Sequence, residues 1–201
     1  MTPSLENEPV SQAALNQLFH EAHTTSAWLP RPVPVQLLHE IYNLARLGPT
    51  SANSQPARFV FVTTEQAKAR LLPAMSAGNL DKTRTAPVTA LIAWDTEFYN
   101  QLPRTFPHAD FRPIFAGNAT LAEETAFRNS SLAGAYFILA ARALGLDCGP
   151  MSGFDAAKVN EEFFPDGKWK INFICNLGQG DPSKSFPRLP RLDFDEACQI
   201  L

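Results

Sequence analysis

Residues 48–63 of this 201-residue chain are Gly48-Pro-Thr-Ser-Ala-Asn-Ser-Gln-Pro56 followed by Ala57-Arg-Phe-Val-Phe-Val-Thr63. The first part holds small polar residues between two prolines, a composition that predicts a stiff loop rich in hydrogen-bond donors and acceptors. The second part is rich in β-branched and aromatic residues, and Arg58–Thr63 is predicted to be a strand. A polar loop that leads into such a strand is compatible both with an ordinary turn and with a binding site.

The rest of the chain alternates between helical and strand patterns. Apolar residues spaced by three and four predict helices, and continuous apolar runs predict strands that are covered on both faces. The predicted helices span residues 11–22, 34–45, 64–72, 120–144 and 194–201, with a further helix after residue 155. The predicted strands span residues 58–63, 88–94 and 170–177. This order predicts an α+β fold in a single domain, residues 11–201, after a flexible N-terminal tail, residues 1–10.

The longest predicted helix carries signals at both ends. Thr120-Leu-Ala-Glu123 has the spacing of a capping box, which favours a helix start at Thr120. Gly145 follows the last apolar position and is expected to end the helix.

Charge and hydropathy exclude several classes of protein. The net charge of −3 gives no electrostatic reason to bind nucleic acid or an anionic membrane. The longest apolar stretch, Leu132–Ala141, is too short to span a bilayer. The first ten residues show neither the basic region nor the apolar region of a signal peptide. The three cysteines form no CxxC motif, which argues against disulfides and favours a cytoplasmic location.

The motifs of common catalytic sites are missing. The four histidines lack the spacing of a zinc site, so no metal is expected. The chain has no G-x-S-x-G elbow, no G-x-G-x-x-G fingerprint and no phosphate-binding G-x-x-x-x-G-K-[ST] loop. No catalytic side chain is therefore assigned, and four polar segments are left as candidates: Gly48–Pro56, Ser76–Lys82, Gly149–Asp155 and Arg188–Arg191.

These segments occur in the same order as in the FMN-dependent nitroreductase family. Gly48–Pro56 resembles that family's A-P-S-x-x-N-x-Q-P segment, and Asn79 and Lys82 stand at its Asn-x-x-Lys positions. Pro150–Asp155 resembles its P-x-x-G-F-D turn. Within the family, GPTSAN, AWDTEFY, LAEETAFRNSS and GLDCGPMSGFD resemble the malonic semialdehyde reductases (3-hydroxypropionate dehydrogenases) of the Rut pathway of pyrimidine degradation.

The resemblance covers residues 11–201 and implies a fold, an assembly and a cofactor. The fold is nitroreductase-like, with a central mixed β-sheet flanked by helices. Two chains interleave in a homodimer that holds FMN at the subunit interface. The cofactor-binding residues carried over from the family are His23, Thr24, Thr50, Ser51, Asn53, Asn79, Lys82, Ser152, Gly153, Arg188 and Arg191.

The resemblance also implies a role for each group of residues. The loop of residues 50–53 approaches the flavin from the partner subunit. Asn79 and Lys82 contact its pyrimidine edge, where a cation stabilises the reduced ring. Backbone N–H groups at Ser152 and Gly153 face flavin N5. Arg191, with Arg188, binds the phosphate.

One departure from the family pattern concerns the phosphate. The family's R-[RH]-S-x-[RK] segment is replaced by Ala22-His-Thr-Thr-Ser26, in which only His23 can carry a positive charge. Taken alone, His23 is an exposed residue at the end of a helix. Hydroxyl and backbone donors are expected to share the phosphate with Arg191, so FMN can dissociate on purification.

The function implied is reduction of malonic semialdehyde to 3-hydroxypropanoate. NADPH or NADH delivers a hydride to flavin N5 and leaves, and the aldehyde then takes the hydride in a ping-pong cycle. Two alternatives are kept. One is a nitroaromatic or quinone reductase with the same fold, and the other is a flavin-binding module without turnover.

Overall fold

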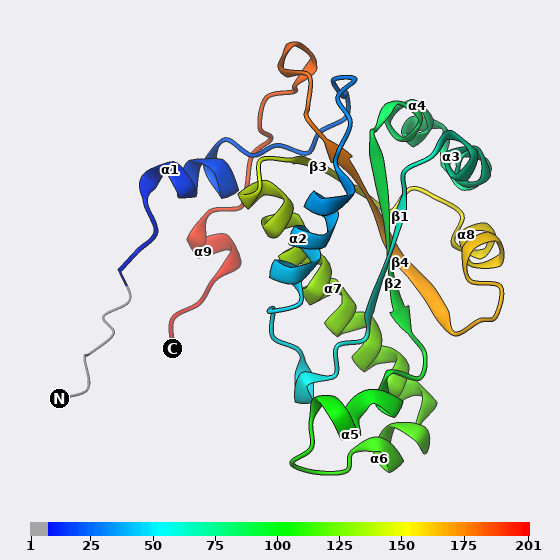
Figure 1. Cartoon of the computed structure of the whole chain (residues 1–201). Coiled ribbons are helices and arrows are strands. Elements are labelled where there is room, and N and C mark those ends of the chain that lie inside the picture. Colours follow the sequence, from blue (N-terminus) through cyan, green and yellow to red (C-terminus); the bar gives the residue numbers. More distant parts are fainter. Residues whose placement is uncertain (1–7) are drawn as a thin grey trace.

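Four strands form one sheet in the computed structural model, which describes residues 8–201. The strand order is β1-β2-β4-β3, and each neighbouring pair is antiparallel. The strands are β1 (Ala57–Val62), β2 (Val88–Asp95), β3 (Asp147–Met151) and β4 (Trp169–Gly178). Helices cover both faces of the sheet (Figure 1). The α+β class is confirmed, whereas most of the predicted tail, residues 1–10, lies outside the described residues.

The sheet differs from the expected one in two ways. β3 is a fourth strand that the sequence did not predict, because Gly149 and Pro150 occupy two of its five positions and both are unfavourable in strands. Pro150 is tolerated because β3 lies at the edge of the sheet. A mixed sheet was expected, but within residues 8–201 the only parallel pairing is the isolated bridge between Thr24 and Cys148.

The helices confirm most of the predicted positions. The helices before residue 102 are α1 (Gln12–Leu15), η1 (Asn16–His20), α2 (Val35–Ala45), η2 (Ser51–Asn53), α3 (Glu65–Leu71), η3 (Leu72–Ala74), α4 (Ala77–Thr85) and η4 (Phe98–Gln101). The remaining ones are α5 (Leu102–Thr105), α6 (Arg112–Ala116), α7 (Ala119–Ala143), α8 (Ala156–Phe163), η5 (Pro182–Lys184) and α9 (Phe194–Ala197).

Helix ends correct two predictions. The long helix α7 begins at Ala119, and its cap is Asn118, whose Oδ1 accepts a hydrogen bond from the Leu121 N–H (3.0 Å). Asn118 therefore takes the capping role that was expected of Thr120, since an asparagine amide caps a helix as well as a hydroxyl does. Gly145, with φ +82°, follows the end of α7 as predicted. The last helix was predicted over residues 194–201, but α9 ends at Ala197.

The apolar run of β2 is buried on both faces of the sheet, as predicted. Successive side chains of a strand point to opposite faces. Ala90 and Ile92 therefore pack in one apolar cluster with α2 and α7, whereas Leu91 and Ala93 pack in a second cluster with α3 and α8. These two cores fix the helices against the sheet and thereby the loops at its edges.

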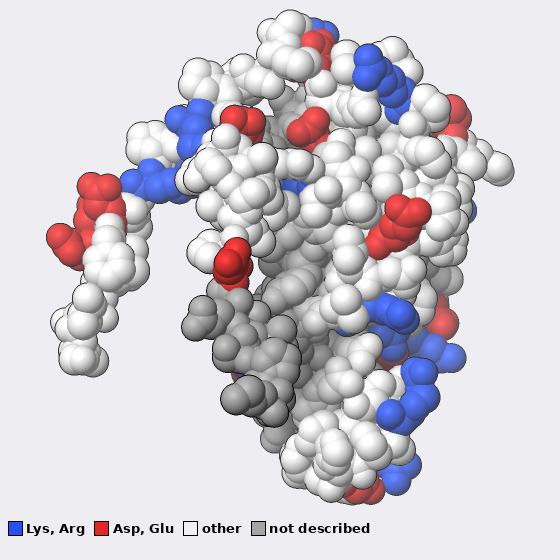
Figure 2. Space-filling view, turned by 60° about the vertical axis from the view of Figure 1, so that its left-hand side comes forward, with Lys and Arg blue, Asp and Glu red and all other residues white. Residues whose placement is uncertain are grey.

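The C-terminal segment after η5 leaves the body of the protein. Its apolar side chains are exposed, namely Phe186, Leu189, Leu192, Phe194, Ile200 and Leu201. In Figure 2 it is the arm at the left of the view, which carries the acidic side chains of α9. Among the described residues, no helix has the length and apolar character needed to cross a membrane.

Candidate functional site

Asn79 and Lys82 lie one turn apart on α4 and meet the segment that follows β3. Asn79 Nδ2 donates to the Gly153 carbonyl (2.9 Å), and Lys82 Nζ donates to Asn79 Oδ1 (3.2 Å). A β-carbon on Gly153 would lie 2.5 Å from Asn79 Nδ2, so a side chain there would displace the amide. The Gly153 N–H itself has no acceptor among residues 8–201. A cation, an amide and a free backbone donor are thus gathered in one patch.

Two contacts hold α4 in this position. The buried Lys68 ammonium donates to the carbonyls of Arg84 (3.1 Å) and Ala86 (2.8 Å), which ends α4 with satisfied acceptors. The indole Nε1 of Trp28 donates to the Lys82 carbonyl (3.0 Å). Both contacts are made by residues distant in the sequence, and neither was predicted.

The segment around Thr24 runs beside β3. Thr24 forms the isolated bridge with Cys148, and the Thr25 N–H donates to the Cys148 carbonyl (2.9 Å). Ser152 follows the other end of the same strand, directly before Gly153. Thr24 and Ser152 are therefore both held at the β3 edge of the sheet, the edge nearest the α4 patch.

Of the two arginines expected on a phosphate, only Arg188 reaches this region. Its Nη2 donates to the carbonyls of Phe19 (2.8 Å) and Ala22 (2.6 Å), beside the half-buried His23. Arg191 is exposed, and its Nη1 donates to carbonyls of its own segment, at residues 189 and 190 (2.9 and 3.1 Å). The structure thus groups His23, Thr24 and Arg188 and leaves Arg191 apart.

The loop of residues 48–56 has an unusual backbone. Ala52, Asn53 and Gln55 have positive φ values of 49°, 47° and 43°. Such values are uncommon for residues other than glycine, and clusters of them occur at functional sites. Hydrogen bonds maintain the conformation: the Gln55 N–H donates to Thr50 Oγ1 (3.1 Å), and Asn53 Nδ2 donates to the Thr105 carbonyl (2.7 Å).

Asn129 on α7 is a residue of this site that the sequence reasoning missed. Its side chain is buried, its Oδ1 accepts from the Ser51 N–H (2.8 Å), and its Nδ2 donates to the Thr125 carbonyl (2.8 Å). A signal was present in the sequence, because Asn129 is a polar residue on the helix face that Ala122 and Ala126 make apolar. A buried amide on an apolar helix face is expected to have a hydrogen-bond partner.

The two groups of predicted residues lie in different places on the sheet. The 50–53 loop precedes the edge strand β1 and contacts α5, whereas Gly153 follows the other edge strand, β3. Asn79 and Lys82 lie on α4, which precedes β2 at the end of the sheet away from the loop (Figure 1). Three strand spacings separate the two edge strands, which is about 14 Å. One chain therefore does not bring all the predicted residues together.

A cavity of about 760 Å³ adjoins the loop. It lies between α2, the loop, β1 and α5, and both Thr50 and Gln55 line it. Aromatic side chains, Tyr42, Phe59 and Trp169, form part of its wall.

The two buried cysteines take no part in these groups. Cys148 and Cys175 are fully buried on the neighbouring strands β3 and β4. The side-chain interaction with Cys148, which favours the protonated form, and burial raise the pKa of the Cys175 thiol well above its usual value. A thiol that stays protonated is a poor nucleophile, so this pair belongs to the core.

Comparison with known proteins agrees with this fold. Residues 4–179 match the sequence model of the nitroreductase family. A protein of Ralstonia nicotianae that carries the name NADH dehydrogenase/NAD(P)H nitroreductase is 60% identical over 189 residues, which are 94% of this chain and 97% of that protein. A protein of Stenotrophomonas maltophilia with the same name is 60% identical over 188 residues, 94% of this chain and 96% of its own length.

Solved structures share the architecture at lower identity. A Bacillus subtilis nitroreductase matches with a TM-score of 0.86 and 24% identity, over 95% of this chain and 100% of that one. An Exiguobacterium sibiricum nitroreductase in complex with FMN matches with a TM-score of 0.84 and 19% identity, over 96% and 99% of the two chains. The nitroreductase-like fold that the sequence predicted is thereby confirmed.

Proposed function

Because this chain belongs to the nitroreductase family, we propose that it is an FMN-dependent oxidoreductase that takes its hydride from NADPH or NADH. The observation that carries the proposal is the patch of Asn79, Lys82 and Gly153. Its relatives that carry the name NAD(P)H nitroreductase, and the FMN complex of the Exiguobacterium protein, support the same cofactors.

The α4 patch fits the edge of a flavin ring. The half-buried Lys82 ammonium supplies the positive charge, and Asn79 supplies an amide for the pyrimidine edge. The Gly153 N–H, which has no acceptor among residues 8–201, is free to donate to a ring nitrogen, and Ser152 lies beside it. When bound, FMN supplies a ring that accepts a hydride from NAD(P)H and passes it to the acceptor. The side chains of this chain position that ring and tune its charge.

The phosphate is assigned to the group at the end of η1. Thr24 offers a hydroxyl, His23 an imidazole and Arg188 a guanidinium that already lies against the Ala22 carbonyl. Arginine binds phosphate through its planar fork of donors. Arg191 stays a predicted phosphate ligand and would have to give up its bonds to residues 189 and 190.

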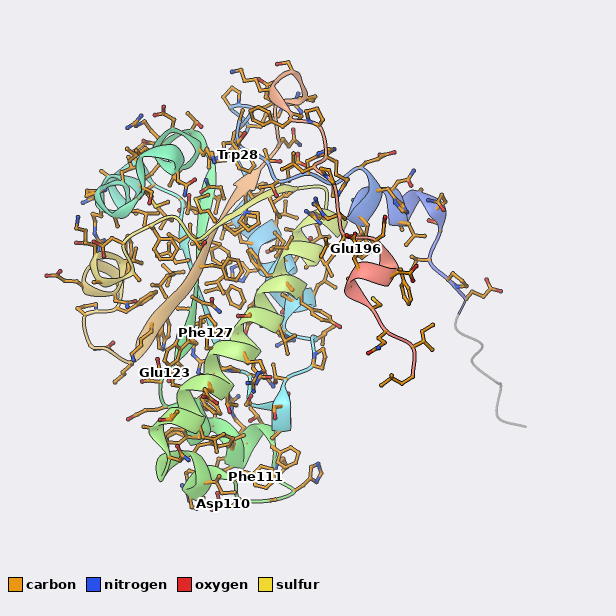
Figure 3. All side chains as sticks on the ribbon, turned by 180° about the vertical axis from the view of Figure 1, so that it is seen from behind. Trp28, Asp110, Phe111, Glu123, Phe127 and Glu196 are labelled. Atoms are coloured by element: carbon orange, nitrogen blue, oxygen red, sulfur yellow. The ribbon has the colours of Figure 1, made fainter. Side chains whose placement is uncertain are left out.

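We propose that two chains complete each site as a homodimer. The loop residues Thr50, Ser51 and Asn53 lie at the opposite end of the sheet from Lys82, so a second copy is needed to place them on the same flavin. Exposed apolar side chains on α7, among them Phe127, which Figure 3 labels, and on the C-terminal arm offer a surface for that copy. Isolated chains rarely leave so much apolar surface in water.

The dimer can be tested by complementation. Lys82→Met and Asn53→Ala should each reduce activity in their own homodimers. A mixed dimer has one site that contains both intact residues, so co-expression should recover about one quarter of the wild-type sites. No recovery in a mixture that contains mixed dimers would mean that each site is built within one chain.

The proposed acceptor is malonic semialdehyde, in the Rut pathway of pyrimidine degradation. The support is the resemblance of segments such as GPTSAN and GLDCGPMSGFD. One aldehyde, one NAD(P)H and one proton give 3-hydroxypropanoate and NAD(P)⁺. The hydride goes to the carbonyl carbon, and the oxygen takes a proton from solvent or a nearby donor.

A nitroaromatic or quinone reductase is the second candidate, favoured by the names of the relatives. The decisive experiment is anaerobic stopped-flow mixing of FMN-reconstituted protein with NADPH or NADH, followed by each acceptor. A higher kcat/KM for the semialdehyde than for a nitroarene supports the first proposal, and the reverse supports the second. Flavin that neither nicotinamide reduces would overturn both and favour a binding module.

We also propose a cytoplasmic location. The three cysteines, Cys148, Cys175 and Cys198, are all unpaired thiols. Free thiols persist in a reducing compartment, where NAD(P)H is also available.

A further inference from the structure

The cavity beside the loop of residues 48–56 has a distinctive charge. Three arginines and one histidine line it, Arg46, Arg58, Arg104 and His39, and its lining includes no aspartate or glutamate of residues 8–201. The chain as a whole has a net charge of −3, so this cavity reverses the sign of the molecule locally. A concave site with one sign of charge concentrates ligands of the other sign.

The arginines differ in whether their charge is already neutralised. Arg58 Nη2 pairs with Asp95 Oδ2 (2.5 Å), and both side chains are mostly buried. Arg104 instead makes one contact to a neutral group, from its Nη2 to Gln101 Oε1 (3.3 Å), and has no carboxylate partner in the described part of the chain. A guanidinium that lines a cavity without a carboxylate is available to an anionic ligand.

The position of Arg104 links it to the proposed reaction. Asn53 Nδ2 donates to the carbonyl of Thr105, the residue after Arg104, so α5 is tied to the loop. Thr50 and Gln55 of that loop line the same cavity. The loop is the part of this chain proposed to face the flavin, and Arg104 therefore stands beside the place where an acceptor would sit. Tyr42 and Phe59 give the same cavity an apolar wall for the remainder of the acceptor.

We infer that Arg104 binds the carboxylate of the acceptor and makes this site selective for short carboxylic acids that carry the reducible group at the other end. The inference rests on the proposed function and adds to it the residue that recognises the substrate class. Arg104 is a specificity-determining residue in this account, since the hydride and the proton are transferred elsewhere.

The test compares a charged acceptor with a neutral one. The probes are malonic semialdehyde and propanal, which have the same carbon chain and differ in the carboxylate. Arg104→Gln should raise the KM for malonic semialdehyde and lower the ratio of the two kcat/KM values by about 10- to 100-fold, the worth of charge-assisted hydrogen bonds. Arg104→Lys should recover part of the ratio, because it restores the charge without the fork. Arg112→Gln, on α6 outside the cavity lining, is the matched control and should leave the ratio unchanged.

A second readout needs no turnover. Malonate binding, measured by isothermal titration calorimetry on the FMN-reconstituted protein, should weaken by a similar factor in Arg104→Gln and stay unchanged in Arg112→Gln. If no acceptor is reduced, propanal included, the proposed function fails while the malonate titration still judges Arg104. An unchanged ratio together with an unchanged malonate affinity would overturn the inference. A dimer that dissociates more readily, with the ratio unchanged, would also overturn it and would place Arg104 in a subunit contact.

Discussion

The Asn129 amide is expected to hold the 50–55 loop in its left-handed conformation. Ala52, Asn53 and Gln55 have positive φ, and each such residue costs roughly 1–2 kcal/mol, or about 3–6 kcal/mol together. Seven hydrogen bonds that involve residues 50–55 oppose this cost, at about 0.5–1.5 kcal/mol each. One is the 2.8 Å bond from the Ser51 N–H to Asn129. The ranges of the two sums overlap, so the loss of one bond should change the population of the loop conformation.

Asn129→Ala removes the acceptor and leaves the Ser51 N–H unpaired. We expect a loss of about 1–3 kcal/mol at this bond, which corresponds to a change of roughly 5- to 150-fold in the loop equilibrium. FMN affinity should fall by up to this factor, because binding must first restore the competent loop. Asn129→Asp keeps an acceptor for Ser51 and should retain more of the affinity than the alanine variant.

The assay is the dissociation constant of FMN from flavin fluorescence quenching, measured beside urea unfolding. The matched control is Asn172→Ala. Asn172 lies at a bulge of β4 and donates to Ser130 Oγ and Ser131 Oγ (2.8 and 2.9 Å) on the same helix, without touching the loop. The control should lose stability and keep its FMN affinity within about twofold of the wild type. Equal FMN affinity in Asn129→Ala and wild type, or equal weakening in both variants, would refute the reasoning.

Three further predictions concern Gly153, Lys68 and the two buried cysteines. Gly153→Ala should weaken FMN binding at least about tenfold, because its methyl group would lie 2.5 Å from Asn79 Nδ2. Gly78→Ala is the control and should leave FMN binding unchanged, because its methyl group would meet nothing within 4 Å. Lys68→Met should lower the free energy of unfolding by about 1–3 kcal/mol in urea titrations, since the carbonyls that end α4 lose their donor; an unchanged midpoint would show that water replaces it. The two buried thiols, Cys148 of β3 and Cys175 of β4, should react with a thiol reagent only at the rate of unfolding, because both are buried and the raised pKa of Cys175 keeps that thiol protonated. Fast labelling in the native protein would contradict this.

Local sequence patterns predicted most of the secondary structure. The continuous apolar run of residues 88–94 indicated a strand covered on both faces, and β2 is that strand. Thr64 was expected to begin a helix, and its Oγ1 accepts from the Ala67 N–H (3.1 Å) at the start of α3. Such signals act over a few residues and need no partner from elsewhere in the chain. β3 was missed because Gly149 and Pro150 weaken a strand pattern that only pairing with β4 stabilises.

For the candidate site, too, local sequence predicted one part and the tertiary structure decided the other. The sequence by itself determined which segments carry polar groups, Gly48–Pro56 and Ser76–Lys82 among them, because small polar residues between prolines or at helix starts are visible without a fold. Only the tertiary structure decided that these segments lie at opposite ends of the sheet and that Arg104 and Asn129 join the first of them. Strand order and helix packing set those distances, and both depend on contacts between residues far apart in the chain.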